Sequence, residues 1–283
     1  MNSEPAYGPI VRYQGDAVIL GETRFDAADA TFRREGVADV WPSVAFPRLP
    51  LGIHAADTPP VFGDANTALL FAVGRPYSRI SIDGRGSWTE WIEIRPDVLA
   101  AMLADHASPF RSGSAPASAS THLAHRRARR RLERDGVADK LALEETALAI
   151  VSDVLAAGRP KKETGRERQR RELVFDVQAL LNRRLGHRLS LADISDAVDV
   201  SPYHLCRVFR EHTGVPIHRY RDGLRLRASL EMIAERDASI LDIALDLGYA
   251  NEAHFSEAFR HAFGVRPGAF RRSVTRTAPP KAT

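Results

Sequence analysis

Apolar positions along the first hundred residues come in short runs that are separated by turn residues. Val18 to Leu20, Thr67 to Val73 and Trp88 to Ile94 are apolar or alternating stretches of strand length. The segments Gly74 to Pro76 and Asp83 to Gly86 lie between them and are typical of turns. Several short strands at this spacing predict a small β-sandwich or barrel.

After Pro96 the apolar spacing becomes helical. Asp97 to His106 is one predicted helix, and Lys140 to Ala157 is a stronger one that packs either on its own domain or on a second subunit. Its apolar residues at helical spacing are Leu141, Leu148, Val151, Val154 and Leu155. Ser112 to Thr121 is rich in Ser, Ala and Pro, which predicts a loop. The basic run His125 to Arg131 predicts a helix whose charged face is either solvated or directed at nucleic acid.

A domain boundary is expected where Gly, Pro and dense charge coincide. Gly158 to Arg171 has this composition and predicts a linker, or a linker that runs into a helix start. Helices are predicted from Glu172 to Arg184, again after Ser190, and onward to about Arg272. The expected division is a β-rich domain with trailing helices over 1–158, a basic linker over 159–171, an all-α domain over 172–273 and a disordered tail over 274–283. The predicted fold class is therefore α+β.

The all-α segment contains an internal repeat. The stretch from Ser190 to Ile194 recurs as Ser239 to Ile243, shifted by 49 residues. The stretch from Leu205 to Arg210 recurs as Phe255 to Arg260, shifted by 50, and Gly214-Val215 recurs as Gly264-Val265 with the same shift. The one-residue slip falls in the middle of the unit, where a turn is expected.

Each part of the repeated unit has a physical role. Ser190 and Ser239 are placed to cap a short helix, and the acid three residues later completes a capping box. The turn in the second copy contains Gly248, which takes a positive φ freely, whereas Asp199 at the corresponding place in the first copy does so less easily. The next helix begins at Ser201-Pro202 or at Asn251 and carries an inward apolar pair four residues apart. Two such units in register, in a basic segment, predict tandem helix-turn-helix units.

The spacing of the units suits double-stranded DNA. A helix of nearly twenty residues, Ile217 to Glu235, is predicted between them, and at about 1.5 Å per residue it spans roughly 28 Å. Successive major-groove faces of B-DNA lie about 34–36 Å apart. One chain could therefore place two recognition helices in adjacent major-groove segments.

Composition and charge support this interpretation without proving it. The chain has 283 residues, 44% hydrophobic and 27% charged, which fits two folded domains. Residues 159–283 hold 23 Lys and Arg against 16 Asp and Glu, whereas residues 1–158 hold 17 against 20, so the basic excess lies in the C-terminal part of the chain. The chain has no apolar run of membrane-spanning length, no signal-peptide pattern and a single cysteine, Cys206. We expect a cytoplasmic protein with no membrane association and no disulfide.

The repeated segments resemble the AraC/XylS family of bacterial transcription regulators. The resemblance covers about Glu172 to Ser273, and the block from Gly248-Tyr249 through Phe263-Gly264-Val265 to Phe270-Arg271 carries most of it. It implies a cupin-like effector-sensing and dimerisation domain over 1–158, where the motifs are weak. It also implies a homodimer that binds promoter or operator DNA, with a small-molecule effector and RNA polymerase as further partners. The effector, the target promoter and the choice between activator and repressor stay open.

The resemblance implies that base edges are read from the exposed face of the second helix in each unit. These expected DNA-binding residues are Ser201, Pro202, Tyr203, Cys206, Arg207 and Arg210 in the first unit, and Asn251, Glu252, Ala253, Ser256, Glu257 and Arg260 in the second. Arg207 is suited to guanine, and Glu252 or Glu257 to the amino group of cytosine. Arg210, Arg260 and His254 suit phosphate or structural roles. Many family members have a basic residue where this chain has Glu257, so the second unit is expected to bind DNA less strongly.

The sequence also leaves alternative functions open. One alternative is a constitutive DNA-binding regulator whose N-terminal domain only dimerises, and another is a metal-cupin enzyme fused to a DNA-binding domain. His54, His106, His122 and His125 form no H-x-H…E cluster, and one cysteine cannot make the four-cysteine zinc site of alkyl-transfer repair members, so neither a metal nor a cofactor is expected. No phosphate-binding glycine loop or nucleophile elbow is present, and we expect no enzyme.

Overall fold

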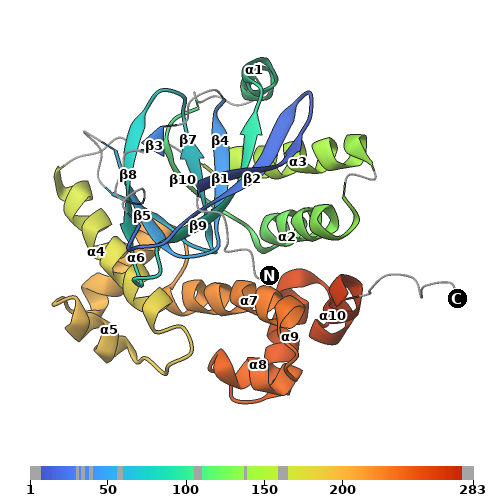
Figure 1. The fold of residues 1–283 in the computed structure, drawn as a ribbon. Coiled ribbons are helices and arrows are strands. Elements are labelled where there is room, and N and C mark those ends of the chain that lie inside the picture. Colours follow the sequence, from blue (N-terminus) through green and yellow to red (C-terminus); the bar gives the residue numbers. More distant parts are fainter. Residues whose placement is uncertain are drawn as a thin grey trace, which may run out of the picture.

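The computed structural model describes residues 8–29, 32, 36–37, 41–55, 60–104, 110–136, 139–158 and 165–275. Its N-terminal part contains two β-sheets and three helices, and its C-terminal part is helical (Figure 1). The predicted α+β class is therefore confirmed. The predicted tail falls mostly on residues 276–283, which lie outside the described residues.

The two sheets of the N-terminal part are antiparallel throughout their described pairings. The larger sheet has the order β1 (Gly8–Gln14), β2 (Val18–Phe25), β9 (Ser87–Ile94), β4 (Ser43–Pro47), β7 (Thr67–Phe71) and β10 (Gly113–Pro116). The smaller sheet has the order β3 (Gly36–Val37), β8 (Pro76–Ser81), β5 (Leu51–His54) and β6 (Val61–Gly63). The three strands predicted from apolar runs correspond to β2, β7 and β9.

Alternation along β2 gives the larger sheet two different faces. Val18 and Leu20 belong to the core shared with the helices α2 (Ala119–Asp135) and α3 (Lys140–Ala157). Gly21 points to the opposite face, where it pairs in register with Trp91 of β9. A Cβ atom on Gly21 would lie 2.2 Å from the Trp91 ring, so the indole occupies the space that a side chain would need. Residues of both sheets form the apolar cluster on this second face.

The helical predictions for this part are confirmed, but the predicted loop is wrong. Asp97 to His106 corresponds to α1 (Pro96–Ala104), with residues 105–109 outside the described ranges, and α3 has the predicted bounds. The stretch Ser112 to Thr121 instead forms edge strand β10, paired with β7, and then the start of α2. Small residues and a terminal proline suit an edge strand, and Ser118 caps α2 by accepting a hydrogen bond from the amide of Thr121.

The basic run on α2 is neither solvated as a whole nor free to face nucleic acid. His125, Arg126 and Arg129 are 1%, 2% and 1% exposed. They face Glu90 of β9, which is itself fully buried. This side of α2 therefore faces an acidic residue inside the protein. For these three residues, both the solvated and the DNA-facing interpretation are wrong.

The C-terminal part consists of seven helices among the described residues. They are α4 (Gly165–Arg183), α5 (Leu191–Ala197), α6 (Pro202–Thr213), α7 (Ile217–Glu235), α8 (Ile240–Asp246), α9 (Glu252–Phe263) and α10 (Pro267–Thr275). Residues 165–171 of the predicted linker belong to α4, and residues 159–164 lie outside the described ranges. The structure thus favours a linker that runs into a helix start.

Each half of this helical part has its own apolar core. Leu181, Leu205 and Phe209 belong to a cluster built by α4, α5, α6 and the first half of α7. Phe255 and Phe259 belong to a second cluster built by the second half of α7 with α8, α9 and α10. The long helix α7 is shared by both cores, so it joins the two halves rigidly (Figure 1).

The two parts of the chain are in direct contact. Helix α2 packs against α7 and α9, and α4 packs against β6. Leu123 of α2 belongs to the same apolar cluster as the second helical half. A buried polar contact lies near the start of α7, where Asn66 donates to the carbonyl of Tyr220 at 2.9 Å and the Tyr220 hydroxyl donates to Asp64 at 2.7 Å. Among the described residues, no helix has the length and apolar character that would allow it to cross a membrane.

Candidate nucleic-acid interface

The first helix-turn-helix unit is formed by α5 and α6. The Ser190 hydroxyl accepts a hydrogen bond from the Asp193 amide at 3.1 Å, and the Asp193 carboxylate accepts one from the Ser190 amide at 2.7 Å. This capping box fixes the start of α5. Ser201 caps α6 with Pro202 at its first position, and Gly214 ends α6 in the left-handed conformation. The predicted signals therefore set the ends of both helices.

The second unit, formed by α8 and α9, repeats this construction. Ser239 and Asp242 make a second capping box, with the Ser239 hydroxyl accepting from the Asp242 amide at 3.0 Å. Asn251 caps α9, and Gly264 ends it in the left-handed conformation. Phe255 and Phe259 are completely buried, as are Leu205 and Phe209 in the first unit. Both apolar pairs predicted from the repeat face inward.

The two turns differ at one residue, as the sequence predicts. Gly248 has a φ of +78°. Asp199 at the equivalent position has a φ of +51° and is the one non-glycine residue with a positive φ among the described residues. Side chains with a Cβ are disfavoured in this conformation. The first unit therefore has the same turn as the second, with backbone strain that the second avoids.

The connecting helix α7 has the bounds that the sequence predicts. Its 19 residues span roughly 28 Å at the usual helical rise. Because both apolar cores include residues of α7, the two units are held on one continuous helix rather than on a flexible tether.

The expected DNA-reading residues of the first unit lie on the exposed side of α6. Tyr203 is 79% exposed, although tyrosine is usually at least partly buried. Ser201, Pro202, Cys206 and Arg210 are exposed as well. The Arg207 side chain is 39% exposed and its Nη1 atom lies 3.0 Å from Glu211 one turn later. Such a surface ion pair is weak, so it leaves the guanidinium available to another partner.

The expected residues of the second unit lie on the corresponding side of α9. Asn251, Glu252 and Ala253 are exposed at the helix start, and Ser256 is half-buried. Glu257 accepts from Arg260 at 2.7 Å, and this contact lowers the pKa of the Glu257 carboxyl. Arg260 thus partly neutralises the charge of Glu257, the acidic residue that distinguishes the second unit from the first. The role of each reading residue in base recognition stays a prediction.

A buried ionic cluster lies where the two parts of the chain meet, and sequence reasoning missed it. Glu90 contacts Arg126, Arg48 at 3.1 Å and Arg129 at 3.5 Å. Although burial favours a protonated carboxyl, the surrounding guanidinium groups hold the pKa of Glu90 far below its ordinary value. Arg48 also contacts Glu231 on α7, at 2.5 Å.

The cluster extends from the sheet to the helical part. Arg126 contacts Glu231, and Arg130 of α2 lies 2.9 Å from Glu235 at the end of α7. Ion pairs therefore tie the sheet and α2 to the helix that carries both helix-turn-helix units. Only the arginine spacing on α2, with residues 126 and 129 one turn apart, signals the cluster in the sequence, and nothing there indicates its acidic partners.

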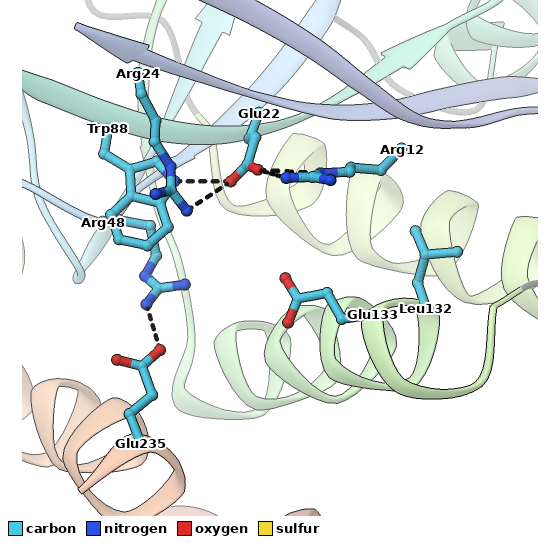
Figure 2. A pocket seen from close by; sticks show the side chains of 8 residues that line it. All are labelled: Arg12, Glu22, Arg24, Arg48, Trp88, Leu132, Glu133 and Glu235. Atoms are coloured by element: carbon cyan, nitrogen blue, oxygen red, sulfur yellow. Dashed lines mark hydrogen bonds and ion pairs between the residues drawn. The ribbon is translucent and has the colours of Figure 1, made fainter. Parts of the chain in front are cut away.

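A polar cavity of about 490 Å³ lies beside this cluster. Figure 2 shows Glu22 between Arg12 and Arg24, with Glu133 of α2 across the cavity and Glu235 of α7 at its edge. Trp88 forms a wall, and the guanidinium of Arg24 stacks 3.6 Å from its ring centre. The cavity lies on the sheet face that packs against α2, and residues of both parts of the chain line it.

The histidines of α2, His122 and His125, are buried. Burial lowers the pKa of His125 to about 3 and that of His122 well below its ordinary value. His125 stacks on Phe46 with ring centres 4.2 Å apart. Within the described ranges, no group of three or more His, Cys, Asp or Glu residues is arranged to hold a metal ion.

Comparisons with known proteins match the helical part. A family model described as a helix-turn-helix domain matches residues 194–273. The "probable transcription factor PqrA" of Proteus vulgaris is 32% identical over 87 residues, which cover 31% of this chain and 71% of that protein. The chain belongs to the AraC family of helix-turn-helix regulators. GlxA, an HTH-type transcriptional regulator of Rhizobium meliloti, is 43% identical over 74 residues, or 26% of this AraC-family chain and 22% of GlxA.

Sequence matches to three curated relatives cover 34%, 26% and 30% of this AraC-family chain. The chain spans 32%, 22% and 28% of the length of these relatives. Among solved structures, an AraC-type transcriptional regulator from Chromobacterium violaceum is 26% identical, with a TM-score of 0.36, and covers 38% of this chain and 96% of its own.

Proposed function

We propose that this protein is a transcription regulator that binds a specific DNA sequence through its two helix-turn-helix units. The observation that carries the proposal is the repeated unit itself, with two capped helices exposed along their outer faces and joined by the continuous helix α7. Two recognition helices on a rigid connector suit adjacent major-groove segments of one duplex. An enzymatic function has no comparable support.

Selection of bound duplexes from a random library tests this proposal. The purified full chain should enrich a motif with two blocks of defined bases, spaced by about one helical turn. Enrichment of no motif, or of general AT-richness alone, would contradict sequence-specific binding.

Within this function, we propose that Arg207 reads a base and that Tyr203 supports it from the same helix face. Arg207→Ala should weaken binding by about 1–3 kcal/mol at one position of the motif and relax the preference there. Arg272→Ala, a change of another exposed arginine that lies outside the reading faces, provides the matched control. An equal loss on every duplex would instead assign Arg207 a phosphate contact.

We further propose that the N-terminal part binds a small polar effector in the cavity beside the ionic cluster. Its volume of about 490 Å³ is within the range of small-molecule sites, and its walls come from both parts of the chain. An effector there would contact Arg48, which also contacts Glu231 and Glu235 of α7, so binding could change how α7 is held.

Thermal shift with a panel of small sugars and carboxylates tests the effector proposal. A compound that stabilises the full chain, changes its DNA affinity and loses both effects in Arg24→Ala supports it. If no compound does so, the constitutive alternative, in which the N-terminal part only dimerises the chain, is favoured. Sedimentation at micromolar concentration tests the proposed homodimer, and in vitro transcription with RNA polymerase distinguishes activation from repression.

A further inference from the structure

A cleft between the two helix-turn-helix units opens among the reading faces. It has a volume of about 670 Å³ and is bordered by α5, α6, the first half of α7 and the start of α9. Cys206 and Arg210 line it from α6, and His254 lines it from α9. All three are exposed, so the cleft faces the side of the molecule that carries the expected DNA-reading residues.

The charge of this cleft is strongly positive. Helix α7 contributes Arg219, Arg221 and Arg225, which with Arg210 make four guanidinium groups. The carboxylate in the lining is that of Asp222, and it accepts a hydrogen bond from the Tyr249 hydroxyl at 2.7 Å. The four guanidinium groups of the lining therefore outnumber its one carboxylate by three positive charges.

Some of these arginines have unused hydrogen-bond donors. In Arg221, Nε and Nη2 are shielded from solvent and have no hydrogen-bond partner among the described residues. Burial, with a further contribution from the Arg225 guanidinium, lowers the pKa of Arg221. The third nitrogen of Arg221, Nη1, donates to the carbonyl of Leu189 at 3.4 Å, and Arg225 donates to the carbonyls of Leu185 and His187 at 3.0 and 3.3 Å. Arg219 is exposed and has no carboxylate partner among the described residues.

The position of the cleft determines what reaches it on a duplex. When α6 and α9 occupy successive major-groove segments on one side of DNA, the minor groove between those segments faces the surface between the two helices. Phosphates of both strands border that groove. A phosphate accepts hydrogen bonds from several guanidinium donors at once. The exposed Arg219 supplies such donors directly, and the partly exposed Arg221 supplies its unpartnered donors once its side chain turns toward the cleft.

We propose that this cleft binds backbone phosphates of the DNA segment between the two recognition sites, with Arg219 and Arg221 as the phosphate-binding residues. The proposal rests on the proposed function, which it deepens by assigning contacts to the connecting helix. Such contacts carry no base preference, but they fix the position of both units on the duplex. Helix α7 is then part of the DNA interface as well as a spacer.

The salt dependence of DNA binding tests the proposal. Fluorescence anisotropy of the full chain is measured between 50 and 200 mM salt on its selected motif and on a scrambled duplex. Each lost phosphate contact should flatten the slope of log affinity against log salt by about 0.9, so Arg219→Gln/Arg221→Gln should flatten it by about 1.8. The affinity lost between the two salt concentrations should then shrink by about twelvefold, equally on both duplexes.

Three further variants make the result decisive. Arg219→Lys/Arg221→Lys keeps the charge and should retain most of the slope. Arg127→Gln/Arg131→Gln removes the same charge from the exposed side of α2 and should leave the slope unchanged. Arg219→Gln alone, at an exposed position, should flatten the slope by about 0.9 even if the double variant fails to fold.

Two results would overturn the proposal. One is a slope in the Arg219 and Arg221 variants that matches that of the unmodified chain, and the other is an equal change in the α2 control. Failure of the proposed function itself has a different signature, because the unmodified chain would then bind the selected motif no better than the scrambled duplex.

Discussion

Replacing Glu90 by glutamine removes the negative charge at the centre of the buried ionic cluster while keeping the size of the side chain. Arg126 and Arg129, which are 2% and 1% exposed, would then lose their shared carboxylate. Removing one partner of a buried ion pair typically costs about 3–5 kcal/mol, because the remaining charges stay buried with less compensation. Here Glu231 still contacts Arg126, and Glu22 and Glu133 still contact Arg129. For a chain of this size, such a cost corresponds to a fall in Tm of roughly 6–20 °C.

Urea denaturation followed by circular dichroism measures this loss. Glu145→Gln, at an exposed position of α3, is the matched control and should change the free energy of unfolding by less than about 0.5 kcal/mol. Adding Arg126→Gln to Glu90→Gln should cost less than the sum of the single changes, since one uncompensated charge is removed. A loss below about 1 kcal/mol for Glu90→Gln, or strict additivity in the double variant, would refute the reasoning.

The same contact predicts how stability depends on pH. The pKa of Glu90 is lowered in the folded chain, so its contribution is fully present above the ordinary value of 4.5 and is lost as the pH falls toward the folded value. Glutamine at position 90 has no ionisable group, so it contributes no such pH dependence. The stability difference between the unmodified chain and Glu90→Gln should therefore narrow as the pH falls below about 4.5. A constant difference down to pH 3 would contradict this assignment.

Three further changes test the backbone and packing arguments. Asp199→Gly should raise the free energy of unfolding by roughly 0.5–1 kcal/mol in thermal or urea melts, because it relieves a positive φ, and a loss of stability would count against the strain. Gly21→Ala should lower it by about 1–3 kcal/mol, since the new methyl group would meet the Trp91 ring; an unchanged melting temperature would show that the indole has room to move. Ser239→Ala should cost about 1 kcal/mol through loss of the capping box, and Ser239→Thr, which keeps the hydroxyl, should recover most of it.

The repeated unit was predictable from sequence because its signals are local. Capping residues, the glycines that end α6 and α9, and inward apolar pairs each act over a few residues, and the structure has them all where the repeat places them. The bounds of α3 and α7 follow for the same reason, since long helices repeat their pattern over several turns.

The ionic cluster, strand β10 and the cleft could not be predicted from the sequence, because each depends on contacts between distant segments. Glu90 and Arg126 are 36 residues apart, and only the pairing of β9 under α2 reveals that the arginines of α2 face inward. The edge strand β10 is built from small residues, which have little strand preference of their own and pair because β7 offers a free edge. The cleft between the units requires the fold of four helices before its arginines can be grouped.

The glutamates at the end of α7 have a consequence for the exchange of domains between relatives. In a regulator with two parts, a chimera can be made by replacing the DNA-binding half with that of a relative. Here Glu231 and Glu235 neutralise arginines that belong to the N-terminal half, among them Arg48, whose side chain is only 9% exposed. A transplanted half that lacks these two acids would leave Arg48 and Arg126 to share Glu90 as their remaining carboxylate among the described residues. In this protein the two halves are separate in sequence, but their ion pairs cross the boundary between them. A working chimera must therefore keep both glutamates.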